Sequence, residues 1–84
     1  MKVKEGFILR KVGRQYVVAA TGEASRNFNG MLRLNEEAAF AFSLLQKGIA
    51  REELMKAVTE KYPAETESTV DAFLEALKEA DAFV

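Results

Sequence analysis

The chain has 84 residues with a formal net charge of −1; 49% of them are hydrophobic, and cysteine and histidine are absent. This length and apolar content predict one globular domain over residues 1–84, without disulfides, thiolate nucleophiles or histidine-based catalysis. The charge is uneven, because residues 1–35 carry seven Lys or Arg against two acids and residues 36–84 carry five against eleven.

Two segments near the start read as strands. Phe7–Val12 and Gln15–Ala20 are rich in β-branched and aromatic residues, which favour extended structure. Gly13-Arg14 separates them, and glycine at the first position of a two-residue loop is typical of a type II′ turn. The segment therefore predicts a β-hairpin, followed by a polar loop over residues 21–29.

A short third strand is predicted over residues 30–34. By the two-residue period of a strand, Leu32 and Leu34 share one face, expected inward, while Met31 and Arg33 share the other. Asn35 follows as a candidate N-cap, because its side chain can accept a hydrogen bond from the first free amides of a helix.

Three helices complete the chain. The first is predicted after Asn35, with an apolar face, and Gly48 terminates it. A second is predicted over residues 51–61, where Ala50 makes a poor N-cap and Pro63 stops the helix. A third should run from about residue 65 to residue 80 and carry the strongest apolar stripe of the chain.

The end of the third helix has its own signal. Asp81 is expected to take the left-handed conformation that glycine usually adopts after a helix. The apolar segment 82–84 is expected to fold back on the core.

The element order is therefore βββααα, an α+β fold with a three-stranded antiparallel meander followed by three helices. Three strands cannot close a barrel, so the first and third strands remain edges. The free amides and carbonyls of such an edge must pair with a partner or with water.

The sequence offers little for catalysis. Glu36-Glu37 and Glu52-Glu53 each open a predicted helix, where the helix dipole favours acids. No glycine-rich phosphate loop is present, and no apolar run approaches the ~20 residues of a membrane span. We expect a non-enzymatic cytoplasmic protein with no cofactor, no metal site and no membrane association.

Two binding alternatives follow from the same parts. Three helices and a hairpin are also the elements of a winged-helix DNA-binding domain, but here the second and third helices are acidic on balance. A self-associating structural module that pairs through its open edge is the other alternative. The basic first half is either a docking surface for an acidic partner or an ordinary solvated surface.

Several motifs, read in order, resemble the PqqD family (pyrroloquinoline quinone biosynthesis protein D). The most specific is the strand-to-helix junction Asn29-Gly-Met-Leu-Arg-Leu-Asn-Glu36. Other matching segments lie around it and cover nearly the whole chain: residues 6–12, 16–18, 21–24, 52–54 before Tyr62, and 70–77.

The chain departs from the family pattern at three positions. Phe42 stands where the family often has tryptophan, Ala50 where a serine or threonine usually caps, and Asp81 where glycine is common. These departures indicate a divergent member.

The resemblance implies a winged-helix-like fold and a peptide chaperone. Such domains bind the leader segment of a ribosomally made precursor peptide and present it to a maturase, often a radical S-adenosylmethionine enzyme. The leader adds as a β-strand to the third strand and packs against the third helix. A monomer or weak dimer is expected.

Carried over to this sequence, the resemblance implies that one wall of the peptide site is the strand edge, formed by Gly30, Met31, Leu32, Arg33 and Leu34. The opposite wall comes from the third helix and consists of Val70, Asp71, Leu74, Leu77 and Lys78. Val70, Leu74 and Leu77 equally fit a purely structural role in the core, and Arg33 is either a plain solvated residue or a partner for an acidic leader residue.

Overall fold

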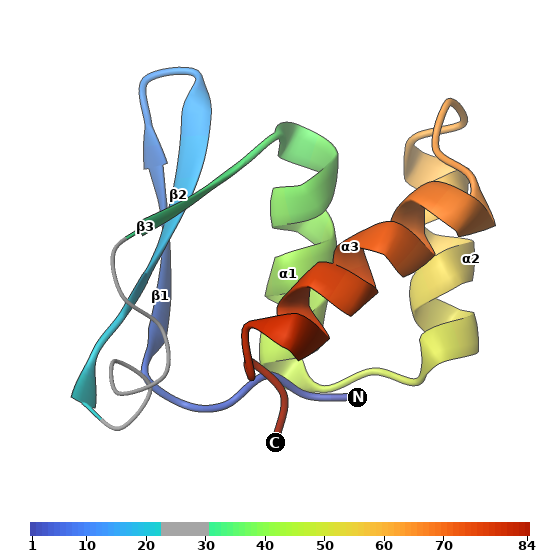
Figure 1. Ribbon diagram of the computed structural model, residues 1–84. Helices are drawn as coiled ribbons and strands as arrows, with labels where there is room; N and C mark the ends of the chain where they lie inside the picture. Colours follow the sequence, from blue (N-terminus) through green and yellow to red (C-terminus); the bar gives the residue numbers. More distant parts are fainter. Residues whose placement is uncertain (23–30) are drawn as a thin grey trace.

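A computed structural model describes residues 1–22 and 31–84, and its elements follow the predicted βββααα order (Figure 1). The three strands form one antiparallel sheet in the order β1-β2-β3. The helices follow in sequence. The bounds are β1 Phe7–Val12, β2 Gln15–Ala20, β3 Met31–Leu34, α1 Glu36–Lys47, α2 Arg51–Lys61 and α3 Glu67–Glu79. The α+β prediction is confirmed. The predicted loop lies outside the described residues except for positions 21 and 22.

The hairpin turn has the predicted type. Val12 pairs with Gln15 across a two-residue loop, and Gly13 has φ +63°. Among the described non-glycine residues only Asp81 has a positive φ, so Arg14 does not. A type I′ turn needs positive φ at both loop positions, and the turn is therefore type II′.

The register separates the two faces of the sheet as predicted. Leu32 lies opposite Val18 and Leu34 opposite Tyr16, and these residues face the helices. Leu34 is buried, whereas Met31, on the opposite face of the strand, is 70% exposed. Helix α1 packs on the inner face, where Phe42 is fully buried and meets Phe7 edge to face with ring centroids 6.2 Å apart.

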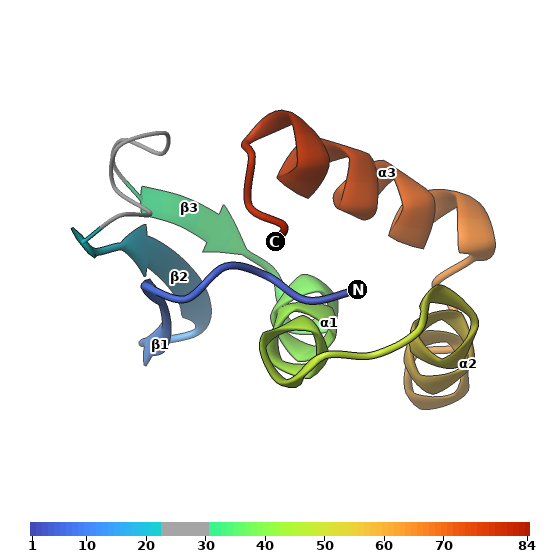
Figure 2. The same ribbon diagram turned by 90° about the horizontal axis from the view of Figure 1, so that it is seen from below.

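Helix α1 lies between the sheet and α2, and α3 crosses over one side of α1 (Figures 1 and 2). Its start is set by Asn35, whose side-chain oxygen accepts a hydrogen bond from the amide of Ala38 at 2.8 Å, as predicted. Gly48 ends it with φ 93° and donates its amide to the carbonyl of Leu44. At Ala50, the N-cap of α2, no side-chain cap bond forms, also as predicted.

Helix α3 starts later than predicted, at Glu67 rather than near residue 65, and ends at Glu79. Thr66 and Thr69 make a reciprocal capping box, in which each side chain accepts a hydrogen bond from the other residue's amide. These bonds satisfy amides that have no intrahelical partner, so the helix begins there. The capping pair was not recognised in the sequence because its third position is threonine rather than glutamate.

The two chain ends pair with each other. Asp81 adopts φ 56°, as predicted, and turns the chain so that Ala82 is buried and accepts a hydrogen bond from the amide of Lys4 at 2.7 Å. Val3 and Phe83 then form an antiparallel β-bridge. The last residue, Val84, is 88% exposed, so the fold-back prediction is correct for Ala82 and Phe83 but not for Val84.

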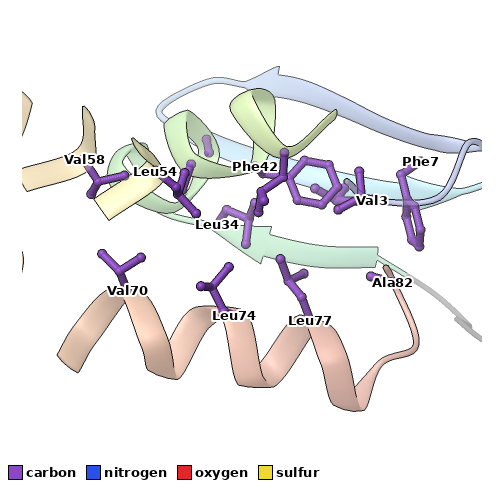
Figure 3. Close-up of a cluster of buried hydrophobic side chains, with 14 residues drawn as sticks. Val3, Phe7, Leu34, Phe42, Leu54, Val58, Val70, Leu74, Leu77 and Ala82 are labelled. Atoms are coloured by element: carbon purple, nitrogen blue, oxygen red, sulfur yellow. The ribbon is translucent and has the colours of Figure 1, made fainter. Parts of the chain in front are cut away.

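The core draws side chains from every element (Figure 3). The α3 stripe of Val70, Leu74 and Leu77 points toward α1 and β3. No buried polar side chain is left without a hydrogen-bond partner in the part of the chain that the structure describes. None of the described helices is long and apolar enough to cross a membrane.

Candidate functional site

Strand β3 has a free edge. It pairs with β2 on one side, and no described strand pairs with its other side. Its described part is Met31–Leu34; Gly30, which was predicted to belong to the same edge, lies outside the described residues. A short exposed edge of this kind presents amides and carbonyls that an extended peptide can pair with.

The register identifies which backbone groups face outward. In a hairpin with a two-residue loop, the pair next to the loop exchanges both hydrogen bonds, and such pairs then alternate along the ladder. Here Val12–Gln15 is that pair, so Tyr16 and Val18 direct their backbone groups toward β3. Their partners, Leu34 and Leu32, point back to β2. Met31 and Arg33 therefore point their amides and carbonyls to the free edge.

A groove begins where β3 ends. It is a hollow of about 380 Å³ between the start of α1, the end of α2 and the first half of α3. Figure 2 shows β3 and α3 on the same side of α1, so the groove and the strand edge lie on one side of the molecule. Its apolar lining comes from Ala38, Ala41, Val58, Val70 and Phe73, and its polar lining from Asn35, Glu37, Glu65 and Thr69.

Helix α1 places the small side chains of this groove. Because Asn35 caps the helix, Ala38 and Ala41 fall one turn apart on the flank that faces α3. Larger side chains at these positions would fill the space between the helices. The polar lining is acidic, with Glu37 on α1 and Glu65 before α3. The carboxylate of Glu65 accepts a hydrogen bond from the Thr69 hydroxyl at 2.9 Å.

The predicted helix wall divides into two parts. Val70, Leu74 and Leu77 are all buried in the core, with exposed fractions of 4%, 6% and 2%. Of these three, only Val70 lines the groove next to β3. The alternative that these residues serve mainly as core therefore describes Leu74 and Leu77 best.

Asp71 and Lys78 lie on the other flank of α3. With Leu74 they line a separate hollow of about 390 Å³, together with Met1 and Arg51. Arg51 donates hydrogen bonds from Nη2 to both carboxylate oxygens of Asp71, each at 2.7 Å. Arg51 thus joins α2 to α3 on the side away from the groove.

The flank of α3 that lines the groove carries Thr69 and Phe73, which sequence reasoning did not select. Phe73 belongs by its helical spacing to the apolar stripe of α3, but spacing alone does not tell which flank of a stripe faces the third strand. That choice depends on the packing of α3 against α1. Arg33 is exposed on the outer face of the sheet, where it lies opposite Val17.

A third hollow of similar size, about 370 Å³, lies on the side of α1 opposite the groove. It contains Tyr62, whose ring meets Phe40 edge to face at 5.8 Å, with the ammonium of Lys61 4.6 Å from the Phe40 ring centre. Partial burial, and secondly a hydrogen bond to Glu36, raise the pKa of the Tyr62 hydroxyl. The hydroxyl is therefore protonated at neutral pH and is not a general base.

The described residues contain no group of three or more Asp or Glu side chains arranged to hold a metal ion. What sets the groove beside β3 apart is its combination of an unpaired strand edge with an apolar hollow at the end of that strand. Main-chain hydrogen bonds along an edge and a neighbouring apolar pocket are the two elements of extended-peptide recognition.

Comparisons with known proteins agree with this architecture. A family model described as "Coenzyme PQQ synthesis protein D (PqqD)" matches residues 9–82. A solved structure, "TbiB1 in Complex with the TbiA(beta) Leader Peptide", superposes with a TM-score of 0.74 and 20% sequence identity, covering 98% of this chain and 93% of that one. At this identity the likeness establishes a shared fold. No curated protein matches the chain.

Proposed function

The chain belongs to the PqqD family, and on that premise we propose that it binds the leader segment of a precursor peptide and presents it to a modifying enzyme. The observation that carries the proposal is the free edge of β3, which ends beside Asn35, a residue that also lines the apolar groove between α1 and α3. The structurally similar TbiB1 was solved with a leader peptide, which supports the same kind of ligand for this fold.

The peptide adds as a fourth strand. Its backbone pairs with the outward amides and carbonyls of Met31 and Arg33, which supply affinity independent of sequence. Side chains supply selectivity: an apolar residue enters the groove against Val70 and Phe73. The carboxylates of Glu37 and Glu65 at the groove favour a basic neighbour, and Arg33 favours an acidic residue on the outer face.

The protein acts by binding and not by chemistry of its own. Its partner in modification is a separate maturase, and a radical S-adenosylmethionine enzyme is the class that the family suggests. Duplex DNA is a poor ligand for the helices, because the exposed face of α3 carries Glu67, Glu75 and Glu79, which repel phosphates.

An amide-detected NMR titration with the precursor peptide encoded beside this chain tests the proposal. We expect saturable shifts in Met31–Leu34 and in Val70 and Phe73. A peptide of the same composition in scrambled order is the control. Shifts confined to the hollow around Tyr62, or to the flank of α3 that carries Asp71, would show that the peptide binds elsewhere.

A further inference from the structure

The outer face of the sheet, away from the helices, carries several exposed large apolar side chains. Its exposed large side chains are Ile8 at 39%, Val12 at 60% and Met31 at 70%. By the register, Ile8, Ala19 and Met31 form one row across the three strands. These side chains alternate with those of Leu9, Val18 and Leu32, which pack in the core, so the row lies on the face of the sheet away from the helices.

Two arginines cross the same face. Arg10 lies opposite Val17 on β2, and Val17 lies opposite Arg33 on β3, so one row reads arginine, valine, arginine. Both guanidinium groups are exposed. The strand residues on this face include no acid, so the face combines positive charge with apolar side chains. This pattern complements a surface on which carboxylates flank apolar side chains.

The size of the face limits the kind of partner. Three strands about 4.8 Å apart and up to six residues long present roughly 300 Å². A stable interface buries about 800 Å² on each partner, so this face alone does not support a lasting dimer. Two copies placed face to face would also bring their arginines together. A protein whose contact extends beyond the sheet fits better.

We propose that the outer sheet face, formed by Ile8, Arg10, Val12, Val17, Met31 and Arg33, docks the peptide-modifying enzyme through an acidic and apolar patch on that enzyme. This docking rests on the proposed function. A peptide added to β3 places every second side chain on this same face, beside Met31 and Arg33. The docked peptide therefore widens the surface, and the enzyme contacts both partners at once.

The test measures binding of the recombinant modifying enzyme encoded beside this chain, first without and then with the precursor peptide. Arg10 and Val12 are chosen because they lie on β1, two strands away from the peptide edge. We expect Arg10→Glu and Val12→Ser each to weaken enzyme binding, with Arg10→Glu weakening it by about tenfold or more. Lys56→Glu makes the same charge change at an exposed position of α2. It is the matched control and should bind the enzyme normally.

The outcomes separate this inference from the proposed function. Peptide affinity, measured alone, should be the same in all variants, and saturating peptide should strengthen enzyme binding to the unmodified chain. If Arg10→Glu and Lys56→Glu weaken enzyme binding equally, or if neither weakens it, the docking surface is wrong even when the peptide binds. Arg10-dependent binding to vesicles of three parts phosphatidylcholine to one part phosphatidylserine, or Val12-dependent dimerisation in sedimentation, also overturns it.

Discussion

Two alanines on α1 keep the groove beside β3 open. Ala38 and Ala41 both line it, and each leaves space that a larger side chain would occupy. Ala41 is buried against the core, whereas Ala38 is only partly buried at the groove wall. Ala38 is therefore the position at which the groove can be filled without disturbing the core.

Ala38→Phe should lower peptide affinity by about ten- to a hundredfold, because the peptide then loses the burial of one apolar side chain worth about 1.5–3 kcal/mol. Isothermal titration calorimetry measures the change. Ala72→Phe on the exposed face of α3 introduces the same residue into a helix and is the control. Unchanged affinity in Ala38→Phe would show that the groove does not hold a peptide side chain.

A second residue-scale feature is the ion pair between Arg51 and Asp71, with Glu67 3.3 Å from the same guanidinium nitrogen. The Arg51 pKa is raised, chiefly by its hydrogen bond to Asp71. Both side chains of the main pair are 44% exposed, so solvent screens most of the attraction. The pair positions α2 against α3 but contributes little stability.

A double-mutant cycle of Arg51→Ala and Asp71→Ala should give a small favourable coupling free energy in urea unfolding, because solvent screens the pair. A coupling of zero would mean that the pair does not persist in solution. The same Asp71 variant tests the sequence-based prediction that Asp71 contacts the peptide. If the peptide lies against Phe73 on the other flank, its affinity is unchanged by Asp71→Ala.

At the scale of the element, the proposed function depends on the orientation of the β3 backbone. Met31 and Arg33 direct their amides outward, while Leu32 and Leu34 pair with β2. A proline at an outward position removes a free donor without breaking the sheet, since prolines are tolerated at strand edges. The backbone role of Arg33 can therefore be separated from the role of its side chain.

Arg33→Pro should abolish measurable peptide binding and leave the fold intact, as checked by circular dichroism and peptide titration. Arg33→Ala removes the guanidinium group but keeps the outward amide, so it should retain most of the affinity. If both variants bind equally well, the Arg33 amide is not part of the peptide contact and strand addition at this position is wrong.

The elements that follow local rules were predictable from the sequence. The type II′ turn depends on Gly13, the α1 start on Asn35 and the α3 end on Asp81, each a local backbone or capping effect. The start of α3 was misplaced because Thr69 completes the capping box in the place of glutamate. The sequence did not show which flank of α3 lines the groove. Phe73 and Asp71 lie on opposite flanks of the same helix, and only tertiary packing decides which flank faces the groove.

At the scale of the whole molecule, long-range contacts hold the site in place. The bridge between Val3 and Phe83 joins the two ends, and the Gln46 side chain donates to the Phe7 carbonyl at 3.1 Å. No local signal marks these contacts, because they join residues far apart in the chain. The Gln46 hydrogen bond joins α1 to the sheet, and the bridge joins the start of the chain to the segment that follows α3.

The whole fold also offers a peptide two strand edges, β1 and β3. The β3 edge ends beside Asn35, which lines the apolar groove between α1 and α3, whereas the β1 edge is flanked by the basic side chains of Arg10 and Lys11. We therefore assign the peptide to the β3 edge.

Amide hydrogen exchange followed by NMR, with and without saturating precursor peptide, tests that claim most directly. In the free protein, Leu32 and Leu34 should already exchange slowly and Met31 and Arg33 quickly, because only the first pair bonds to β2. With peptide, Met31 and Arg33 should become slow. Unchanged exchange at Met31 and Arg33, or new protection of Leu9 and Lys11 on β1, would contradict peptide addition at β3.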